Sequence, residues 1–175
     1  ITNSFSVMLL PAIAQAQAEH AEHKIRNYIT LSGKYSLFIG YLFTCLFLLF
    51  GKDFGMLIFH SEDAGVYIYA LSWLCPFLYL STTFTSIING LGKTQLTFFA
   101  TAISLFIKIY FLIFLVPLYG IQAYLVGSLI SQIIMTLFEG FYLRHYISFP
   151  IGSFFFIPCC CLLLLGGLLK KLYLA

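Results

Sequence analysis

Residues 95–144 read QLTFFATAISLFIKIYFLIFLVPLYGIQAYLVGSLISQIIMTLFEGFYLR, and their only full charges are Lys108, Glu139 and Arg144. Extending the stretch to residues 64–169 adds a single further charge, Lys93. The whole chain is 61% hydrophobic and 9% charged, whereas soluble domains carry about 25% charged residues because their surfaces face water. Most side chains must therefore face lipid or one another. The sequence predicts an integral membrane protein rather than a soluble domain.

The apolar sequence divides into segments of the length that crosses a bilayer. About 20 mainly apolar residues span roughly 30 Å of hydrocarbon. Five segments meet this criterion, and residues 1–18 resemble the inner end of a sixth helix; the five are 30–51, 64–88, 95–116, 121–143 and 151–169. Their near-continuous apolar runs contradict the alternating pattern of a membrane β-barrel. We therefore predict an all-α membrane bundle.

Short turn sequences separate these segments, and they are NGLG at 89–92, PLYG at 117–120 and SFP at 148–150. Such short turns predict antiparallel neighbouring helices. The resulting organisation is a helix end with a cytoplasmic connector over 1–24, four transmembrane helices over 25–146 and a further helix over 147–175. No signal-peptide pattern opens the sequence, and we expect it to be part of a longer protein.

The basic residues of the loops predict the orientation, because Lys and Arg accumulate on the cytoplasmic side. One side of the alternation carries Lys24, Arg26, Lys34, Lys93 and Arg144, and the other carries Lys52 beside Asp53, Glu62 and Asp63. The first side is therefore predicted to be cytoplasmic. Lys170 and Lys171 break this rule and leave the orientation of the last segment open.

Polar residues recur at helical spacing inside two of the predicted spans. They are Thr97, Thr101, Ser104 and Lys108 in 95–116, and Ser128, Ser131, Gln132, Thr136 and Glu139 in 121–143. A polar side chain within a bilayer must find a partner or line a cavity. We predict that a substrate cavity is lined by Thr101, Ser104, Lys108, Ser128, Ser131 and Gln132. Ordinary hydroxyl hydrogen bonding between packed helices is the alternative for the Ser and Thr residues.

Three positions within the spans have more specific interpretations. An ammonium at mid-span costs at least about 2.5–3.5 kcal/mol, so we expect Lys108 to face water, an anion or acceptors, with Ser131 and Gln132 at its depth. Glu139 is expected near the inner interface, where Arg144 or His145 could meet it, and this position favours a structural role for it. Pro76 would kink its helix and could act as a hinge, although proline is common in membrane helices.

Other chemistries receive little support from the sequence. The run EHAEH at 19–23 lacks the HExxH order of zinc peptidases, and NGLGK lacks the spacing of a phosphate-binding loop. The five cysteines suit small apolar packing residues. The spans offer no acid, base and nucleophile at one depth, so we expect no enzyme, no metal, no cofactor and, at a net charge of +3, no nucleic-acid partner.

Three motifs in order carry a resemblance to a known family. They are LLPAIAQA at 9–16, INGLGKT at 88–94, and IKI at 107–109 followed by VPLYGI at 116–121. The chain resembles the polysaccharide biosynthesis protein family, specifically its members similar to stage V sporulation protein B. That family lies within the multidrug/oligosaccharidyl-lipid/polysaccharide exporter superfamily, and the resemblance extends to about residue 146.

The resemblance implies the second lobe of a two-lobed, MATE-like flippase fold in the bacterial inner membrane. Such a protein moves an undecaprenyl-linked saccharide for the cell wall or spore coat between leaflets by alternating access. Its partners would be that lipid-linked saccharide, membrane lipid, an N-terminal lobe absent from this sequence, and H+ or Na+ as candidate coupling ions. A cation-coupled multidrug exporter of the same superfamily is the second transport function, and a scaffold without transport activity is the third interpretation.

Overall fold

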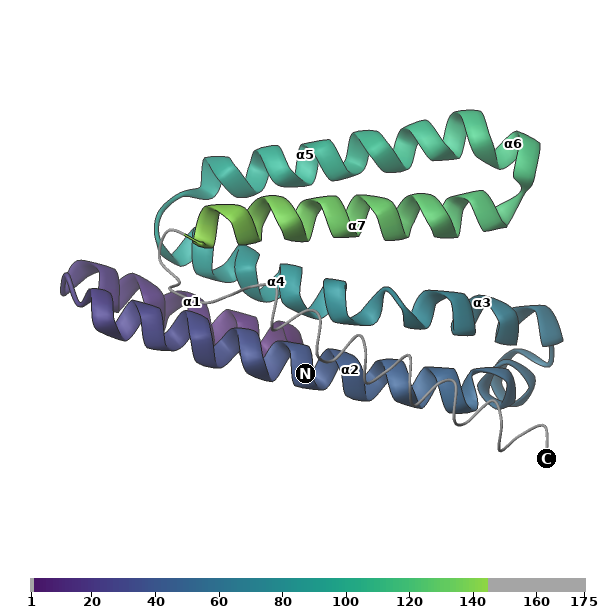
Figure 1. Cartoon of the computed structure of the whole chain (residues 1–175), viewed down its shortest axis with the longest axis horizontal. Coiled ribbons are helices and arrows are strands. Elements are labelled where there is room, and N and C mark those ends of the chain that lie inside the picture. The colour runs from purple at the N-terminus through teal and green to yellow at the C-terminus, as the bar shows by residue number, and fades with distance from the viewer. Residues whose placement is uncertain (1, 145–175) are drawn as a thin grey trace.

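The computed structural model describes residues 2–144, which form a helical bundle (Figure 1). The chain is helical in every regular element of this range. The elements are α1 (Thr2–Ala18), α2 (Glu22–Phe59), α3 (Glu62–Ser72), α4 (Cys75–Gly90), α5 (Thr94–Tyr110), the π-helix η1 (Phe111–Leu115), α6 (Val116–Tyr119) and α7 (Ile121–Leu143). The predicted segment 151–169, with its three cysteines, lies outside the described residues.

Helix α2 is much longer than the span predicted at 30–51. It runs without interruption through 38 residues, which corresponds to about 57 Å at 1.5 Å per residue. The connector expected up to residue 24 is a short turn between Ala18 and Glu22, and the basic residues from Lys24 to Lys34 that were assigned to the cytoplasmic side lie on α2. His60, in a left-handed conformation (φ 52°), ends the helix and donates its N–H to carbonyls of the last turn.

The predicted span 64–88 is two helices, α3 and α4, which meet at an angle of 50°. The bend was expected at Pro76, and it occurs just before it. Pro76 lies in the first turn of α4, where its missing N–H removes no helical bond. Helix α2 packs closely on this break, because a Cβ at Gly40 would lie only 2.8 Å from the Cα of Pro76. The hydroxyl of Thr44 donates to the carbonyl of Ser72 at the end of α3 (3.1 Å).

The helices α5, η1 and α6 form one span from Thr94 to Tyr119 that packs on α7. Its outer part contains a π-helical turn, and the ring of Phe111 from that turn lies against Gly127 of α7, where an added Cβ would be 2.5 Å from Cγ of the phenylalanine. Gly120, with φ of 70°, separates α6 from α7. Helix α7 has the bounds predicted from the sequence.

The dimensions and composition of these helices are those of a membrane protein. Among residues 2–144, three helices are long and apolar enough to cross a membrane, or four if the bent pair α3 and α4 is one span. The α1–α2 turn, the α4–α5 turn and the end of α7 lie at one end of the bundle (left in Figure 1). That end carries Lys24, Lys93 and Arg144, as the predicted alternation requires.

The most tightly packed core lies between α1, α2 and α4, with the last turn of α7. Its least exposed members include Ile13, Ile29, Ile87, Ile88 and Leu143. Large apolar side chains on the other faces remain exposed in the isolated chain, with many of them on α2, α5 and α7. An apolar exterior of this kind fits a lipid environment.

Candidate functional site

Three hydrogen bonds join α4 to α7 in the interior of the bundle, and we call this contact the α4–α7 seam. Its α4 positions are Phe77, Ser81 and Thr85, and its α7 positions are Gln132, Thr136 and Glu139. Residues spaced by four lie on one face of a helix. A single polar face of α4 thus meets the polar stripe of α7.

Two of the seam's bonds are between groups without charge. The side-chain amide of Gln132 donates to the hydroxyl of Ser81, and both side chains are buried. The hydroxyl of Thr136 lies 3.2 Å from the backbone carbonyl of Phe77, to which it can donate. Such bonds hold membrane helices together at about 0.6 kcal/mol each on average.

Glu139 is the ionisable residue of the α4–α7 seam, and its side chain is only 1% exposed. The hydroxyl of Thr85 donates to Oε1 at 2.7 Å. The second oxygen, Oε2, is buried and has no hydrogen-bond partner among the described residues. Within residues 2–144 no ion pair joins this carboxyl to a Lys or Arg.

Glu139 does not form the expected ion pair with Arg144 within residues 2–144, and His145 lies outside the described residues. The last turns of α7 are covered by other helices, because Leu143 belongs to the core formed with α1, α2 and α4. A Cβ at Gly140 would lie 3.4 Å from the ring of Phe84 on α4. The depth of Glu139 along α7 could be estimated from the sequence, but the sequence does not say which helices cover this end of α7.

The predicted cavity residues of α5 and α7 are only partly brought together. Ser128, Ser131 and Gln132 are buried, as is Ser104, whereas Lys108 is half-buried and Thr101 is exposed. Gln132 turns toward α4 rather than toward Lys108, and Ser131 donates to the carbonyl of Ser128 on its own helix. In the described part of the chain Lys108 forms neither a hydrogen bond nor an ion pair. A substrate cavity lined by these residues stays a prediction.

A second buried polar contact joins α2 to α4 and was not anticipated. The hydroxyls of Ser36 and Thr83 lie 2.5 Å apart, and both side chains are buried. The signal for it in the sequence is the spacing of Ser32, Ser36 and Thr44 on one face of α2. The hydroxyl of Thr97 on α5 also donates to Oδ1 of Asn89 on α4 (2.8 Å), so polar contacts join α4 to three helices, α2, α5 and α7.

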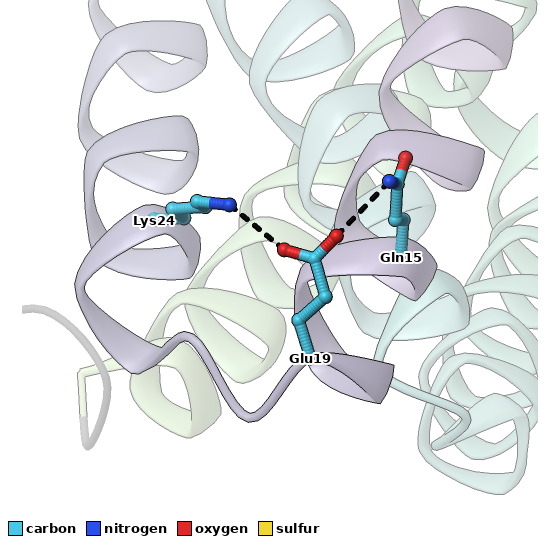
Figure 2. A network of polar contacts seen from close by, with 3 residues as sticks. All are labelled: Gln15, Glu19 and Lys24. Carbon is cyan, nitrogen blue, oxygen red and sulfur yellow. Dashed lines mark hydrogen bonds and ion pairs between the residues drawn. The ribbon is translucent and has the colours of Figure 1, made fainter.

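The EHAEH run comprises the turn between α1 and α2 and the first two residues of α2, at the end of the bundle that carries Lys24, Lys93 and Arg144. Figure 2 shows Glu19 between two partners, with Lys24 Nζ 2.8 Å from Oε2 and Gln15 Nε2 3.0 Å from Oε1. The hydrogen bond from Lys24, then that from Gln15, lowers the pKa of the Glu19 carboxyl. In this structure the exposed Glu19 carboxylate is thus hydrogen-bonded through both oxygens, to Gln15 and to Lys24.

Comparison with known proteins adds no relative to this description. No family model matches the chain, and no curated protein and no solved structure matches it. What the residues establish is a helical membrane protein with a buried polar seam.

Proposed function

We propose that the chain is part of a flippase that moves a lipid-linked saccharide across a bacterial cytoplasmic membrane by alternating access. The substrate class comes from the resemblance of the three sequence motifs to the polysaccharide biosynthesis family. In the structure LLPAIAQA lies on α1, INGLGKT at the α4–α5 turn, IKI within α5, and VPLYGI on α6 and the α6–α7 turn. INGLGKT and VPLYGI thus lie where helices end, whereas LLPAIAQA and IKI lie within helices.

The observation that carries a transport function is the α4–α7 seam. Polar groups inside an apolar bundle are costly unless they are paired, and they mark substrate or ion pathways in membrane proteins. A purely structural bundle needs small residues for close packing, but it has no need of a buried carboxyl with one oxygen unpartnered. Glu139 and its seam therefore favour transport over a scaffold.

The broken span α3–α4 is the second feature that supports alternating access. Discontinuous helices occur near the binding sites of many transporters, and α4, which carries the polar face of the seam, begins at this break. Thr44 and Gly40 of α2 contact the residues on its two sides, Ser72 and Pro76. A change of angle here would move α4 relative to α3, which gives Pro76 the hinge role proposed from the sequence.

Lys108 is the group we assign to the diphosphate of the lipid carrier. It lies in the last turn of α5 and is half-buried. A compact ammonium binds phosphate as a point charge. A lost charge-assisted contact is worth about 1.5–3 kcal/mol, or roughly a tenfold to 150-fold change in rate at 1.4 kcal/mol per tenfold.

The test measures flipping of a fluorescent undecaprenyl-diphosphate-linked saccharide by the full-length protein in liposomes. Lys108→Met is expected to slow flipping at least tenfold, and Lys108→Arg to retain part of the rate. Lys93→Met is the matched control, because Lys93 precedes α5 at the end of the bundle, and it should leave the rate within twofold. A Lys108→Met protein that flips at the wild-type rate contradicts the assignment of Lys108. Extrusion of a lipophilic cation without saccharide flipping would support the multidrug exporter instead.

A further inference from the structure

Glu139 has chemistry that the saccharide proposal does not use. Its carboxyl lies between two membrane helices, is almost fully buried, and receives one hydrogen bond, from Thr85. Its other oxygen is buried without a hydrogen-bond partner in the described part of the chain. A carboxylate in this position would be an anion removed from water with one hydroxyl to stabilise it.

An anion so poorly compensated is strongly disfavoured in an apolar medium, where an isolated ionised group takes up a proton or requires a counter-charge. Apart from α3 and α6, the elements packed on α7 carry the ionisable side chains Cys75 and Tyr79 on α4 and Lys93, Lys108 and Tyr110 at and within α5, and α7 itself carries Tyr124, Tyr142 and, at its end, Arg144. None of the three cationic side chains forms an ion pair with Glu139 in residues 2–144. Helices α3 and α6 lie toward the opposite end of the bundle from the end of α7 (Figure 1).

We propose that Glu139 and Thr85 form a proton-binding site that joins α4 to α7 inside the membrane. In this structure the carboxyl is neutral, with Oε1 as the carbonyl oxygen that accepts the hydrogen bond from Thr85 and Oε2 as the protonated oxygen. The ligand is a proton, because a hard metal cation takes about six or more oxygen ligands. The described residues contain no group of three or more His, Cys, Asp or Glu that could hold a metal ion.

Loss of the proton would leave the anion at the α4–α7 seam, where only water or a cation could stabilise it. The seam must then admit one of them, so protonation stabilises the closed contact between α4 and α7. Proton occupancy and the packing of α7 on α4 are therefore linked. This inference does not depend on the saccharide, so flipping assays and the test below can fail separately.

Infrared spectroscopy of the full chain in lipid nanodiscs tests the site directly. A protonated carboxylic acid has a carbonyl stretching band that a carboxylate lacks. At neutral pH we expect this band in the wild-type chain, its loss in Glu139→Gln and its retention in Glu19→Gln, since Glu19 is exposed and paired with Lys24. Thr85→Val should move the band to higher frequency, because the carbonyl loses its hydrogen bond. Raising the pH should remove it.

A second measurement needs no substitution and so does not depend on how the variants fold. Glutamate labelled with ¹³C at the side-chain carboxyl should shift the band in the wild-type chain to lower frequency. The proposal is overturned if the neutral-pH spectrum has no protonated-acid band, or if the band survives Glu139→Gln. Loss of the band on adding NaCl at constant pH would assign the carboxylate to a cation and overturn the proton assignment.

Discussion

The crossing of α2 and α3 leaves no room for a side chain at Gly55, which makes it the most sensitive position of this hairpin. A Cβ there would lie 2.5 Å from the Cα of Gly65 and 3.1 Å from the carbonyl carbon of Ala64. The obstructing atoms are backbone and cannot rotate away. The backbone nitrogen of Gly65 would lie closer still, so to reach ordinary contact at 3.4 Å the two helices must separate by at least about 0.9 Å, the difference between 3.4 and 2.5 Å. A gap of roughly 0.5–1 Å forfeits a quarter to a half of a contact's attraction.

We therefore expect Gly55→Ala to lower the free energy of unfolding by about 2 kcal/mol. Overpacking costs about 1–3 kcal/mol, and the gain in helix propensity on replacing Gly by Ala offsets at most about 1 kcal/mol of it. Gly33→Ala is the matched control on the same helix, since a Cβ there meets nothing within 4 Å. It should stabilise the chain by up to about 1 kcal/mol.

The assay is reversible unfolding in mixed micelles as sodium dodecyl sulfate is added, followed by circular dichroism and tryptophan emission. Trp73 is the chain's one tryptophan and lies at the α3–α4 break, so its emission reports on the affected hairpin. The emission transition of Gly55→Ala should shift to lower detergent fraction, and that of Gly33→Ala should not. If Gly55→Ala proves as stable as Gly33→Ala, the close backbone contact between α2 and α3 does not exist in the membrane.

Three further predictions concern the α3–α4 break, the orientation of the chain in the membrane and the contacts of Glu19. Thr44→Val removes the donor to the Ser72 carbonyl, and it should destabilise the chain by about 1 kcal/mol in the same unfolding assay. In a cysteine-free background, a cysteine at Thr94 should be protected from an impermeant thiol reagent in intact cells and one at Ser61 should react; the reverse pattern would invert the topology. The Glu19 pKa lies below its ordinary value of 4.5, so its pairing stabilises the folded state above that pH and is lost as the pH falls. Carboxyl titration by NMR should give a midpoint below 4.5 that rises when the partner lysine is removed, and an unchanged midpoint would contradict the pairing.

Helix α7 could be predicted to the residue because its signals are local. PLYG marks where it starts, and an unbroken apolar run with one polar stripe follows. The break between α3 and α4 could be predicted only approximately. Pro76 indicates that the helix is irregular nearby, but packing against α2 decides on which side of Pro76 the bend occurs. The length of α2 was underestimated because charged residues at both ends were taken as loop, although a helix can extend beyond the bilayer.

The surroundings of Glu139 could not be predicted for a different reason. Position along a helix gives the depth of a residue, but it does not say which neighbour covers it. Thr85 is far away in the sequence and belongs to a helix whose path is set by the α3–α4 break and by contacts with α1 and α2. Gln132 was predicted to line a cavity at the depth of Lys108, which stays a prediction, and its contact with Ser81 was missed on the same grounds.

The π-helical turn at Phe111–Leu115 also sets how the segment between it and Gly120 is rotated relative to α5. Such a turn holds one residue more than the α-helix around it, and an α-helix rotates by about 100° per residue at 3.6 residues per turn. Deleting one residue here would restore a regular helix and rotate everything up to Gly120 by that angle. The residues of η1 and α6 that follow Phe111 would lose their present positions against α7, so the extra residue sets which side of this segment faces α7.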